Sequence, residues 1–310
     1  MNKSVLCIGA TLVDELYFCE QNCIPHTSNP AAKTTSIGGV ISNIAQHLGL
    51  LQLHPSLITA LGTDAEADYI AKSLNQKGIT LDQSVLAKDT TGKYVSIMNP
   101  DGNLVVAVCQ DISSKYLTPA FLESKILFIK EFDFVIIDTN IPAASIQWLI
   151  DFAKTHQQKL IIEPVSVAKA TKLAALNLEG VFMITPNEDE LTAIANLDTT
   201  NESALVQSLF RRGVQQVWIR KGNQGSVICT PYQSLALGVP EISISDSTGA
   251  GDAALAAWVF GYLNHENGQT CLQLAHALAL EVLQIKGSVV QHLNSEYLYR
   301  IKNTYYNEHQ

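Results

Sequence analysis

Charged residues are scarce in this sequence. Asp, Glu, Lys and Arg make up 16% of its 310 residues, whereas hydrophobic residues make up 47%. A chain of this length and composition can bury a large core, so a single α/β domain over residues 1–310 is expected. Basic residues are scarcer than acidic ones, so the formal net charge is -9 and the sequence pI is about 5.3. Since nucleic acids bind basic surfaces, this balance argues against nucleic-acid binding and favours a small-molecule partner.

Cysteine pairs and long apolar runs are missing as well. No CxxC pair occurs among the six cysteines, which argues against a zinc site and a disulfide framework and predicts reduced thiols. The apolar stretch at residues 5–9 is too short for the core of a signal peptide, and no run reaches membrane-spanning length. We therefore expect a cytoplasmic protein with no membrane partner. The cysteines are Cys7, Cys19, Cys23, Cys109, Cys229 and Cys271.

Two common nucleotide-binding signatures are absent. The sequence has no GxxxxGK(S/T) segment, which excludes a Walker-type P-loop. Gly9-Ala10-Thr11 after the first apolar run does not supply the GxGxxG of a dinucleotide-binding turn. Any nucleotide site must therefore be built from other glycine turns.

From about residue 134 onwards, short apolar segments alternate with helical patterns. The apolar segments are rich in Val, Ile and Leu, and the segments between them carry apolar residues at helical spacing. This alternation predicts a largely parallel sheet covered by helices on both faces. Ligands of such a sheet bind beyond the carboxyl ends of its strands. The predicted strands are residues 134–138, 160–163, 181–185 and 217–220.

The strongest functional signal is the glycine turn of residues 246–252, which runs into a helix-forming segment. Gly249, Ala250 and Gly251 can direct backbone N–H groups toward an anion at a helix N-terminus. An acidic residue at the end of this turn would repel phosphate unless it faced a hydroxyl group instead. Asp252 is therefore predicted to be the general base of a phosphoryl transfer. The alternative is that Asp252 only caps its helix.

A second glycine turn, Gly38-Gly39, opens another predicted helix. Asn43 follows Gly39 by four residues, so both lie on one face of the first helical turn. Asp14, after the first strand, offers a carboxylate that can accept two hydrogen bonds from vicinal hydroxyls. These residues suit a sugar diol, although a plain helix start explains the diglycine equally well.

Two further turns follow predicted strands. Asn187 and Glu190 lie i, i+3 at a helix start, where they can hold Mg²⁺-bound water around nucleotide phosphates or simply cap the helix. Lys221, Gly222 and Gly225 lie between two strands, where a nucleotide can lie against the glycine backbone. An ordinary hairpin turn is the alternative at that position.

These motifs, in this order, resemble the ribokinase-like family of carbohydrate and nucleoside kinases, the PfkB family. The resemblance spans nearly the whole chain and implies a three-layer α/β/α fold with a small β-sheet lid. We expect the lid from approximately residues 12–37 and 93–110, where a hairpin is predicted at 94–98 and 104–109. The resemblance also implies ATP and Mg²⁺ as cofactors. It leaves a homodimer through the lid and a monomer as the two options for assembly.

The resemblance assigns a role to each motif residue. Asp252 is the base, and the amides of Gly249, Ala250 and Gly251 form the anion hole. The implied sugar contacts are Asp14, Gly38, Gly39 and Asn43, and the implied nucleotide contacts are Asn187, Lys221, Gly222 and Gly225. Glu190 is implied as a Mg²⁺ ligand through water, and Asp246 and Thr248 as ligands of a monovalent cation, K⁺. Many relatives have a Thr where this chain has Lys221, so a charge that can meet phosphate replaces a hydroxyl.

Softer motifs are similar to pseudouridine kinases within the family, especially Glu163-Pro-Val-Ser-Val167 and Asp138-Thr-Asn140. They favour ATP-dependent phosphorylation of the 5′-hydroxyl of pseudouridine, with ribose, adenosine and uridine as alternative substrates. The group that accepts the N1–H of pseudouridine is expected on the lid or in residues 163–169.

Two other classes of protein fit the sequence less well than a kinase. A non-catalytic ligand-binding relative needs no base beside an anion hole, so the Asp252 turn argues against it. A Rossmann-type dehydrogenase fits the strand–helix alternation but lacks the glycine fingerprint. The sequence therefore favours the kinase.

Overall fold

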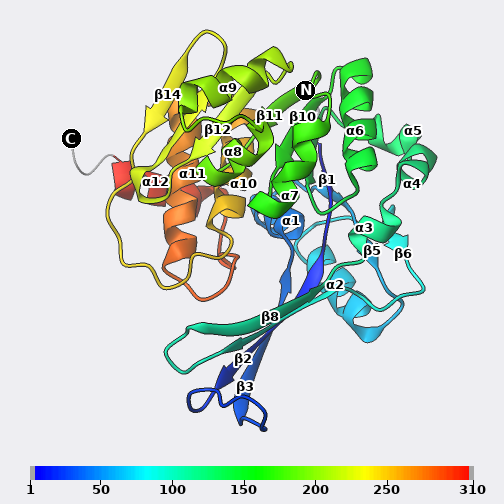
Figure 1. Ribbon diagram of the computed structural model, residues 1–310, viewed down its shortest axis with the longest axis vertical. Helices are drawn as coiled ribbons and strands as arrows, with labels where there is room; N and C mark the ends of the chain where they lie inside the picture. The colour runs from blue at the N-terminus through cyan, green and yellow to red at the C-terminus, as the bar shows by residue number, and fades with distance from the viewer. Residues whose placement is uncertain (1–3, 307–310) are drawn as a thin grey trace.

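Eight strands form the central sheet of the computed structural model, which describes residues 4–306. They are β1 (Val5–Ile8), β4 (Ser56–Ile58), β9 (Phe134–Asp138), β10 (Lys159–Glu163), β11 (Val181–Ile184), β12 (Gln216–Arg220), β13 (Ser226–Cys229) and β14 (Ser234–Leu237). In space their order is β14-β13-β12-β11-β10-β9-β1-β4 (Figure 1). The pairs from β4 to β12 are parallel, and the pairs β12–β13 and β13–β14 are antiparallel. The four strands predicted after residue 134 thus lie side by side.

Helices cover both faces of this sheet, as predicted. Successive side chains of a strand point to opposite faces, so Val5 and Cys7 join one hydrophobic cluster and Leu6 and Ile8 the other. The first cluster is completed by α1 (Val40–Leu50), α2 (Ala65–Asn75), α10 (Ala250–Leu263), α11 (Gly268–Leu283) and α12 (Ser295–Tyr306). The second is completed by α3 (Ser113–Tyr116), α4 (Pro119–Ser124), α5 (Ile126–Ile129), α6 (Ala143–His156), α7 (Val167–Ala170), the 3₁₀ helix η1 (Thr171–Ala175), α8 (Glu188–Ala195) and α9 (Glu202–Arg211). Among the helices of residues 4–306, none is long and apolar enough to cross a membrane.

A smaller sheet of four strands projects from the main body (Figure 1). Its strands are β2 (Leu12–Cys19), β3 (Ala31–Gly38), β7 (Lys93–Met98) and β8 (Leu104–Gln110), in the order β3-β2-β7-β8. The predicted hairpin is the antiparallel pair β7–β8, and β7 lies parallel to β2. A further pair, β5 (Ala60–Leu61) and β6 (Val85–Leu86), forms a separate two-stranded sheet. The segments expected to form the lid are thus adjacent in space.

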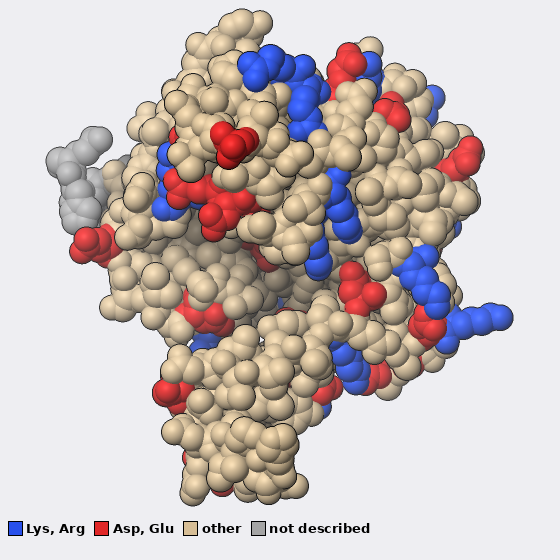
Figure 2. Space-filling model, viewed as in Figure 1, with Lys and Arg blue, Asp and Glu red and all other residues tan. Residues whose placement is uncertain are grey.

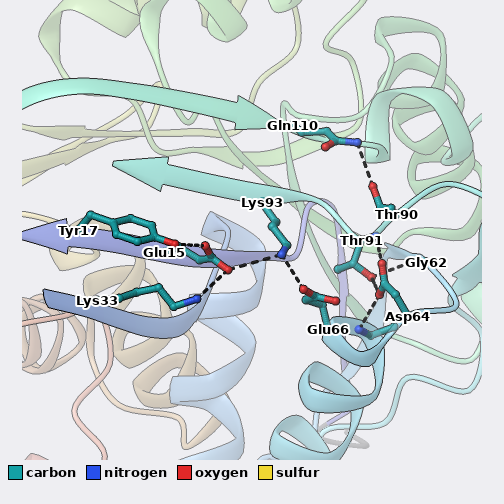
Figure 3. Close-up of polar contacts among 11 residues, drawn as sticks. Glu15, Tyr17, Lys33, Gly62, Asp64, Glu66, Thr90, Thr91, Lys93 and Gln110 are labelled. Atoms are coloured by element: carbon teal, nitrogen blue, oxygen red, sulfur yellow. Dashed lines mark hydrogen bonds and ion pairs between the residues drawn. The ribbon is translucent and has the colours of Figure 1, made fainter. Parts of the chain in front are cut away.

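Charged side chains tie the base of the small sheet to α2 (Figure 3). Lys93 of β7 lies 2.6 Å from Glu66 of α2 and 3.5 Å from Glu15 of β2. Asp64 caps α2 by accepting a 3.0 Å hydrogen bond from the Ala67 amide, and it also accepts the Thr91 hydroxyl at 2.5 Å. Because these contacts lie where the chain enters and leaves the sheet, they set its orientation toward the main body.

The Cys19–Cys23 pair contradicts the prediction of reduced thiols. Cys19 ends β2, and Cys23 lies in the loop where the chain reverses toward β3. Their Cα atoms are 6.3 Å apart, within disulfide range, and their sulfurs are bonded. A spacing of four residues carries no CxxC signal, because only the reversal of the chain brings these two thiols together. The free cysteines are Cys7, Cys109, Cys229 and Cys271.

Candidate active site

The glycine turn of residues 246–252 leads directly into α10. Gly249 is the N-cap residue and has a φ of +81°. A Cβ at Gly249 would lie 2.5 Å from the Cβ of Ser288, so only glycine fits at this position. No side chain of the described residues caps this helix start. The N–H groups of Ala250 and Gly251 are therefore available to an anion.

Asp252 lies in the first turn of α10 without capping it. Its Oδ2 accepts a 2.9 Å hydrogen bond from Asn43 Nδ2 instead, so the capping interpretation is wrong. Burial, and next the charge of Glu163, raise the pKa of Asp252 to about 7, whereas Asn43 and Arg220 oppose this rise. A general base works best with a pKa near the working pH. The environment of Asp252 therefore suits proton acceptance.

Asn43 joins α1 to the first turn of α10 and to the loop after α11. While its Nδ2 donates to Asp252, its Oδ1 accepts a 3.1 Å hydrogen bond from Ser288 Oγ. The side chain that the sequence assigned to the sugar therefore orients the predicted base in this structure. Its backbone N–H bonds to the carbonyl of Gly39 at 2.9 Å, which places both residues on the first turn of α1, as expected.

Asp14 of β2 faces the diglycine at the start of α1. A Cβ at Gly38 would lie 2.2 Å from Asp14 Cγ, and a Cβ at Gly39 would lie 2.3 Å from the carbonyl oxygen of Ala10. Gly39 also has a φ of +96°, so both glycines are required for close approach. Burial raises the pKa of Asp14 to about 6. In the part of the chain that the structure describes, no group donates a hydrogen bond to this carboxylate, which leaves it for a ligand.

A polar cluster at the end of β9 was not assigned to the site from the sequence. Asp138 is fully buried and accepts hydrogen bonds from the Ala10 amide at 3.1 Å and from Asn140 Nδ2 at 2.8 Å. Lys169 Nζ donates to Asn140 Oδ1. The positive charge of Lys169 also opposes the rise that burial causes in the pKa of Cys109 on β8. The sequence signal was Asp138-Thr-Asn140 at a strand end, which supported only the resemblance.

A second cluster joins β10, β11 and β12, and from the sequence only its Glu163 was named, whereas Arg220 and Thr185 were given no role. Arg220 Nη2 lies 2.7 Å from Glu163 Oε1, and Thr185 Oγ1 donates to Glu163 Oε2 at 2.6 Å. The guanidinium lies against Gly251 of the anion-hole turn, since a Cβ there would be 2.3 Å from Arg220 Nη1. The available signal in the sequence was Arg220, a charged residue at the end of a buried strand. A guanidinium cannot lie unpaired inside such a strand, so its place at the strand end indicates a polar partner there.

Asn187 and Glu190 form a capping box at the start of α8. Asn187 Oδ1 accepts the Glu190 amide at 2.8 Å, and Glu190 Oε2 accepts the Asn187 amide at 2.9 Å. Burial raises the pKa of Glu190. Within residues 4–306, no three His, Cys, Asp or Glu side chains converge as a metal site. The water-mediated contact of Glu190 to Mg²⁺, which usually binds through few carboxylates, water and nucleotide phosphates, stays a prediction.

The predicted nucleotide loop connects β12 to β13 through the 3₁₀ turn η2 (Gly222–Gln224). Gly225 has a φ of +85°, and a Cβ there would lie 2.1 Å from the carbonyl oxygen of Leu237. Lys221 pairs with Glu202 of α9 at 2.6 Å rather than pointing alone toward a phosphate site.

The residues predicted to bind a monovalent cation lie in the loop before α10. Asp246 Oδ1 accepts a 2.9 Å hydrogen bond from the Thr248 amide. One carboxylate oxygen thus serves the loop itself, and the cation site stays a prediction.

Figure 2 shows a hollow between the main body and the small sheet. Acidic side chains gather over α8, whose first turn carries Glu188, Asp189 and Glu190. Basic side chains lie beside α7 on the same face. Cavities of about 380 and 240 Å³ open at the opposite edge of the sheet, near Gln215 and Gln216, and contain none of the predicted residues. The candidate site therefore lies at the carboxyl ends of the strands.

Comparison with known proteins identifies the family. A family model described as pfkB family carbohydrate kinase matches residues 2–293. The chain belongs to this family. It is 26% identical to a pseudouridine kinase of Escherichia coli K12 over 266 residues, which cover 83% of this chain and 84% of that protein. It is also 26% identical to a ribokinase of Staphylococcus aureus over 267 residues, which cover 84% of this chain and 86% of the relative.

Solved structures of PfkB-like kinases share the fold. A ribokinase of Arabidopsis thaliana complexed with ribose and ATP superposes with a TM-score of 0.84 at 20% identity, covering 96% of this chain and 98% of that one. A putative sugar kinase of Clostridium perfringens gives 0.85 at 22% identity, covering 97% and 95%. The predicted ribokinase-like fold is thereby confirmed. As a PfkB kinase, the chain transfers a phosphoryl group to an alcohol group of a sugar or nucleoside.

Proposed function

We propose that this PfkB kinase transfers the γ-phosphoryl group of ATP to the 5′-hydroxyl of pseudouridine, in the cytoplasm. The observation that carries the proposal is the buried Asp252, oriented by Asn43 and placed one residue after the anion-binding turn. A ligand-binding relative without turnover has no use for a carboxylate whose pKa is about 7 beside such a turn.

The reaction follows from these positions. Asp252 accepts the proton of the 5′-hydroxyl while that oxygen forms a bond to the γ-phosphorus, and the bond to the β–γ bridging oxygen breaks to release ADP. The N–H groups of Gly249, Ala250 and Gly251 stabilise the charge on the transferred group. Asn187, Gly222 and Gly225 position the nucleotide, and Glu190 holds Mg²⁺ through water. Bound Mg²⁺ supplies charge neutralisation of the phosphates. K⁺ beside Asp246 and Thr248 is a further part of the proposal.

The substrate is inferred from the groups around the sugar site. Asp14 accepts the ribose hydroxyls, with Gly38 and Gly39 allowing the close approach. Asn140 and Lys169 add polar groups beyond those that a free pentose needs, and the Lys169 charge reaches Cys109 on β8. Each Glu163 oxygen already accepts two hydrogen bonds, whereas Asn140 Oδ1 accepts one, from Lys169 Nζ. Because Asn140 Oδ1 keeps a second lone pair, it is the better acceptor for the N1–H of pseudouridine. The similarity to a pseudouridine kinase supports this choice.

Steady-state kinetics with pseudouridine, uridine, adenosine and ribose test the proposal. We expect the highest kcat/KM with pseudouridine, because uridine has no N1–H to donate to Asn140 Oδ1. Ribose is the second candidate, since the ribokinase relative is equally similar. A clear preference for ribose, or equal values for pseudouridine and uridine, would remove the pseudouridine assignment and leave the kinase assignment intact.

Assembly is proposed to be a homodimer through the small sheet. Its edge strand β8 exposes Leu104, Val106 and Val108, and pairing with a second copy would cover them. Light scattering after size-exclusion chromatography measures the mass in solution. A monomer at all concentrations would exclude this assembly.

A further inference from the structure

Arg220 ends β12 at the centre of the candidate site. Its Nη2 lies 2.7 Å from Glu163 Oε1 and 2.9 Å from Glu163 Oε2, and it also donates to the carbonyl oxygen of Thr185. The Arg220 side chain is 19% exposed and that of Glu163 is 4% exposed. One edge of the guanidinium is thus held firmly by groups that are themselves buried.

The opposite edge of the guanidinium faces the anion-hole turn. A Cβ at Gly251 would lie 2.3 Å from Arg220 Nη1, so Nη1 is in direct contact with the backbone of that residue. No described residue between Ser4 and Tyr306 accepts a hydrogen bond from Nη1 or Nε, whereas Nη2 has three acceptor atoms. Donors of a charged group are strongest when they meet an anion. Arg220 therefore holds unused donors beside the N–H groups that bind an anion.

A purely structural role explains this arrangement less well. Arg220 is close enough for its charge to act on Glu163, Glu190 and Asp252, so it could serve only to neutralise the acidic cluster. A guanidinium in that role would direct its donors to several carboxylates. Asp252 instead bonds to Asn43, and Glu190 bonds to the Asn187 amide, so Arg220 is bonded to Glu163 alone among the acids.

We propose that Arg220 is a catalytic residue that donates hydrogen bonds to the phosphoryl group in transfer, and that Glu163 is the positioning residue that holds it. The proposal rests on the ATP-dependent phosphoryl transfer proposed above and does not depend on the identity of the acceptor. Arg220 keeps its proton throughout. It stabilises charge on the equatorial oxygens while Asp252 takes the proton of the hydroxyl. Gly251 then has a second function, because any side chain there would displace Nη1.

Nucleotide binding separates this role from a structural one. Isothermal titration calorimetry with MgCl₂ measures the Kd of ADP and of β,γ-imido-ATP for wild type, Arg220→Met, Arg220→Lys and Glu163→Gln. With Arg220→Met, we expect the Kd of β,γ-imido-ATP to rise about tenfold or more, the scale of one charge-assisted hydrogen bond, and that of ADP to change little. Arg220→Lys should recover part of the loss, because it keeps the charge without the planar fork.

Arg212 offers a matched control. Its guanidinium is also half-buried and donates to the carbonyls of Ile194, Leu173, Ala174 and Leu176, and within residues 4–306 it has no carboxylate partner. Arg212→Lys should lower thermal stability and leave the ratio of the two Kd values unchanged. If Arg220→Met does not fold, Glu163→Gln provides the same comparison, since it weakens the hold on Arg220 and should raise the Kd of β,γ-imido-ATP selectively.

The outcomes are distinguishable from those for the proposed function. An equal loss of both nucleotides, or an unchanged ratio in the folded variants, would overturn the role of Arg220 even if pseudouridine is a good substrate. A selective loss of β,γ-imido-ATP would support it even if pseudouridine is not phosphorylated. With any substrate that the wild type turns over, kcat should fall in Arg220→Met and Glu163→Gln more than the KM of the acceptor rises.

Discussion

Three aspartates near the carboxyl edge of the central sheet have pKa values that burial raises. Those of Asp14 and Asp138 reach about 6, and that of Asp252 reaches about 7. Their partners differ. Asp138 is held by amides of Ala10 and Asn140, Asp252 has one hydrogen bond from Asn43, and Asp14 has none within the described chain. The number of hydrogen bonds to the carboxylate thus falls from Asp138 to Asp252 to Asp14. This order is the one expected for a supporting residue, a base and a carboxylate that binds a ligand, respectively.

Replacing Asp252 by Asn tests the base directly. The variant keeps the size of the side chain and an acceptor for Asn43 but cannot take up a proton. We expect kcat to fall by about 10²-fold or more, the usual scale for the loss of a general base, with binding of the substrate retained. Steady-state kinetics and calorimetric binding measure the two quantities. Near-normal turnover in a folded Asp252→Asn protein would rule out this role.

The pH dependence follows from the raised pKa of Asp252. Because the carboxylate form is the base, kcat/KM should rise with pH up to about 7 and then level off. Glu163 and Asp138 raise this pKa, and Asn43 and Arg220 lower it. An acidic limb centred near pH 4 in the rate profile would contradict the assignment.

The raised pKa of Asp252 also predicts that the free energy of unfolding falls as pH rises, whereas kcat/KM rises. The folded chain holds the Asp252 proton more tightly than the unfolded chain does. This contribution is therefore fully present below about pH 4 and is lost as pH rises through about 7. Relative to wild type, Asp252→Asn should gain free energy of unfolding between these pH values. Urea denaturation at pH 5 and pH 8 measures the gain, and an equal difference at both values would contradict it.

At the level of elements, three helix starts build the site in different ways. The start of α10 carries no side-chain cap within the described chain, and α1 begins after a glycine whose φ is +96°. The start of α8 is closed by the reciprocal Asn187–Glu190 bonds. The first two therefore leave backbone groups and space for ligands, whereas the third is capped by its own side chains.

Substitutions of Asn187 separate capping from nucleotide binding. Asn187→Ala removes the acceptor of the Glu190 amide and should lower the free energy of unfolding by about 1 kcal/mol. Asn187→Ser restores a cap acceptor and should recover most of this stability. Both variants should raise the KM for ATP, because neither offers the amide to the phosphates. A normal KM in Asn187→Ser would mean that Asn187 serves only as a cap.

At the level of the whole molecule, the proposed substrate site joins two structural units. Asp14 belongs to the small sheet, whereas Asn43 and Asp252 belong to helices of the main body. Lys93 and Glu66 tie the base of the small sheet to α2, so the two units keep a defined orientation. A bound ribose would therefore hold both units together through its hydroxyls.

Deoxy substrates test this bridging. The loss of a hydroxyl leaves a buried carboxylate without its partner, at about 1–3 kcal/mol, so kcat/KM should fall about tenfold or more for 2′- or 3′-deoxy analogues. Asp14→Asn should reduce the difference between ribo and deoxy substrates. If deoxy analogues of the preferred substrate react as fast as the parent, Asp14 does not bind the diol.

The family, the layered fold and the glycine turns could be predicted from the sequence. Buried strands of Val, Ile and Leu and glycines with forced backbone geometry are local properties, and they remain visible without any tertiary contact. The prediction of reduced thiols was wrong for Cys19 and Cys23, because their pairing depends on how the chain folds back and not on a local sequence pattern. Cys19 and Cys23 meet only because the chain reverses after β2.

The partners of each charged side chain were decided only by the tertiary structure. Arg220 meets Glu163 across 57 residues because the parallel strands β10 and β12 end at the same side of the sheet. Asn43 meets Asp252 across 209 residues because α1 packs against α10. Sequence spacing carries no information about such pairs. It also carries none about the burial that raises the pKa of Asp252, since the helices and strands around that carboxylate come from distant parts of the chain.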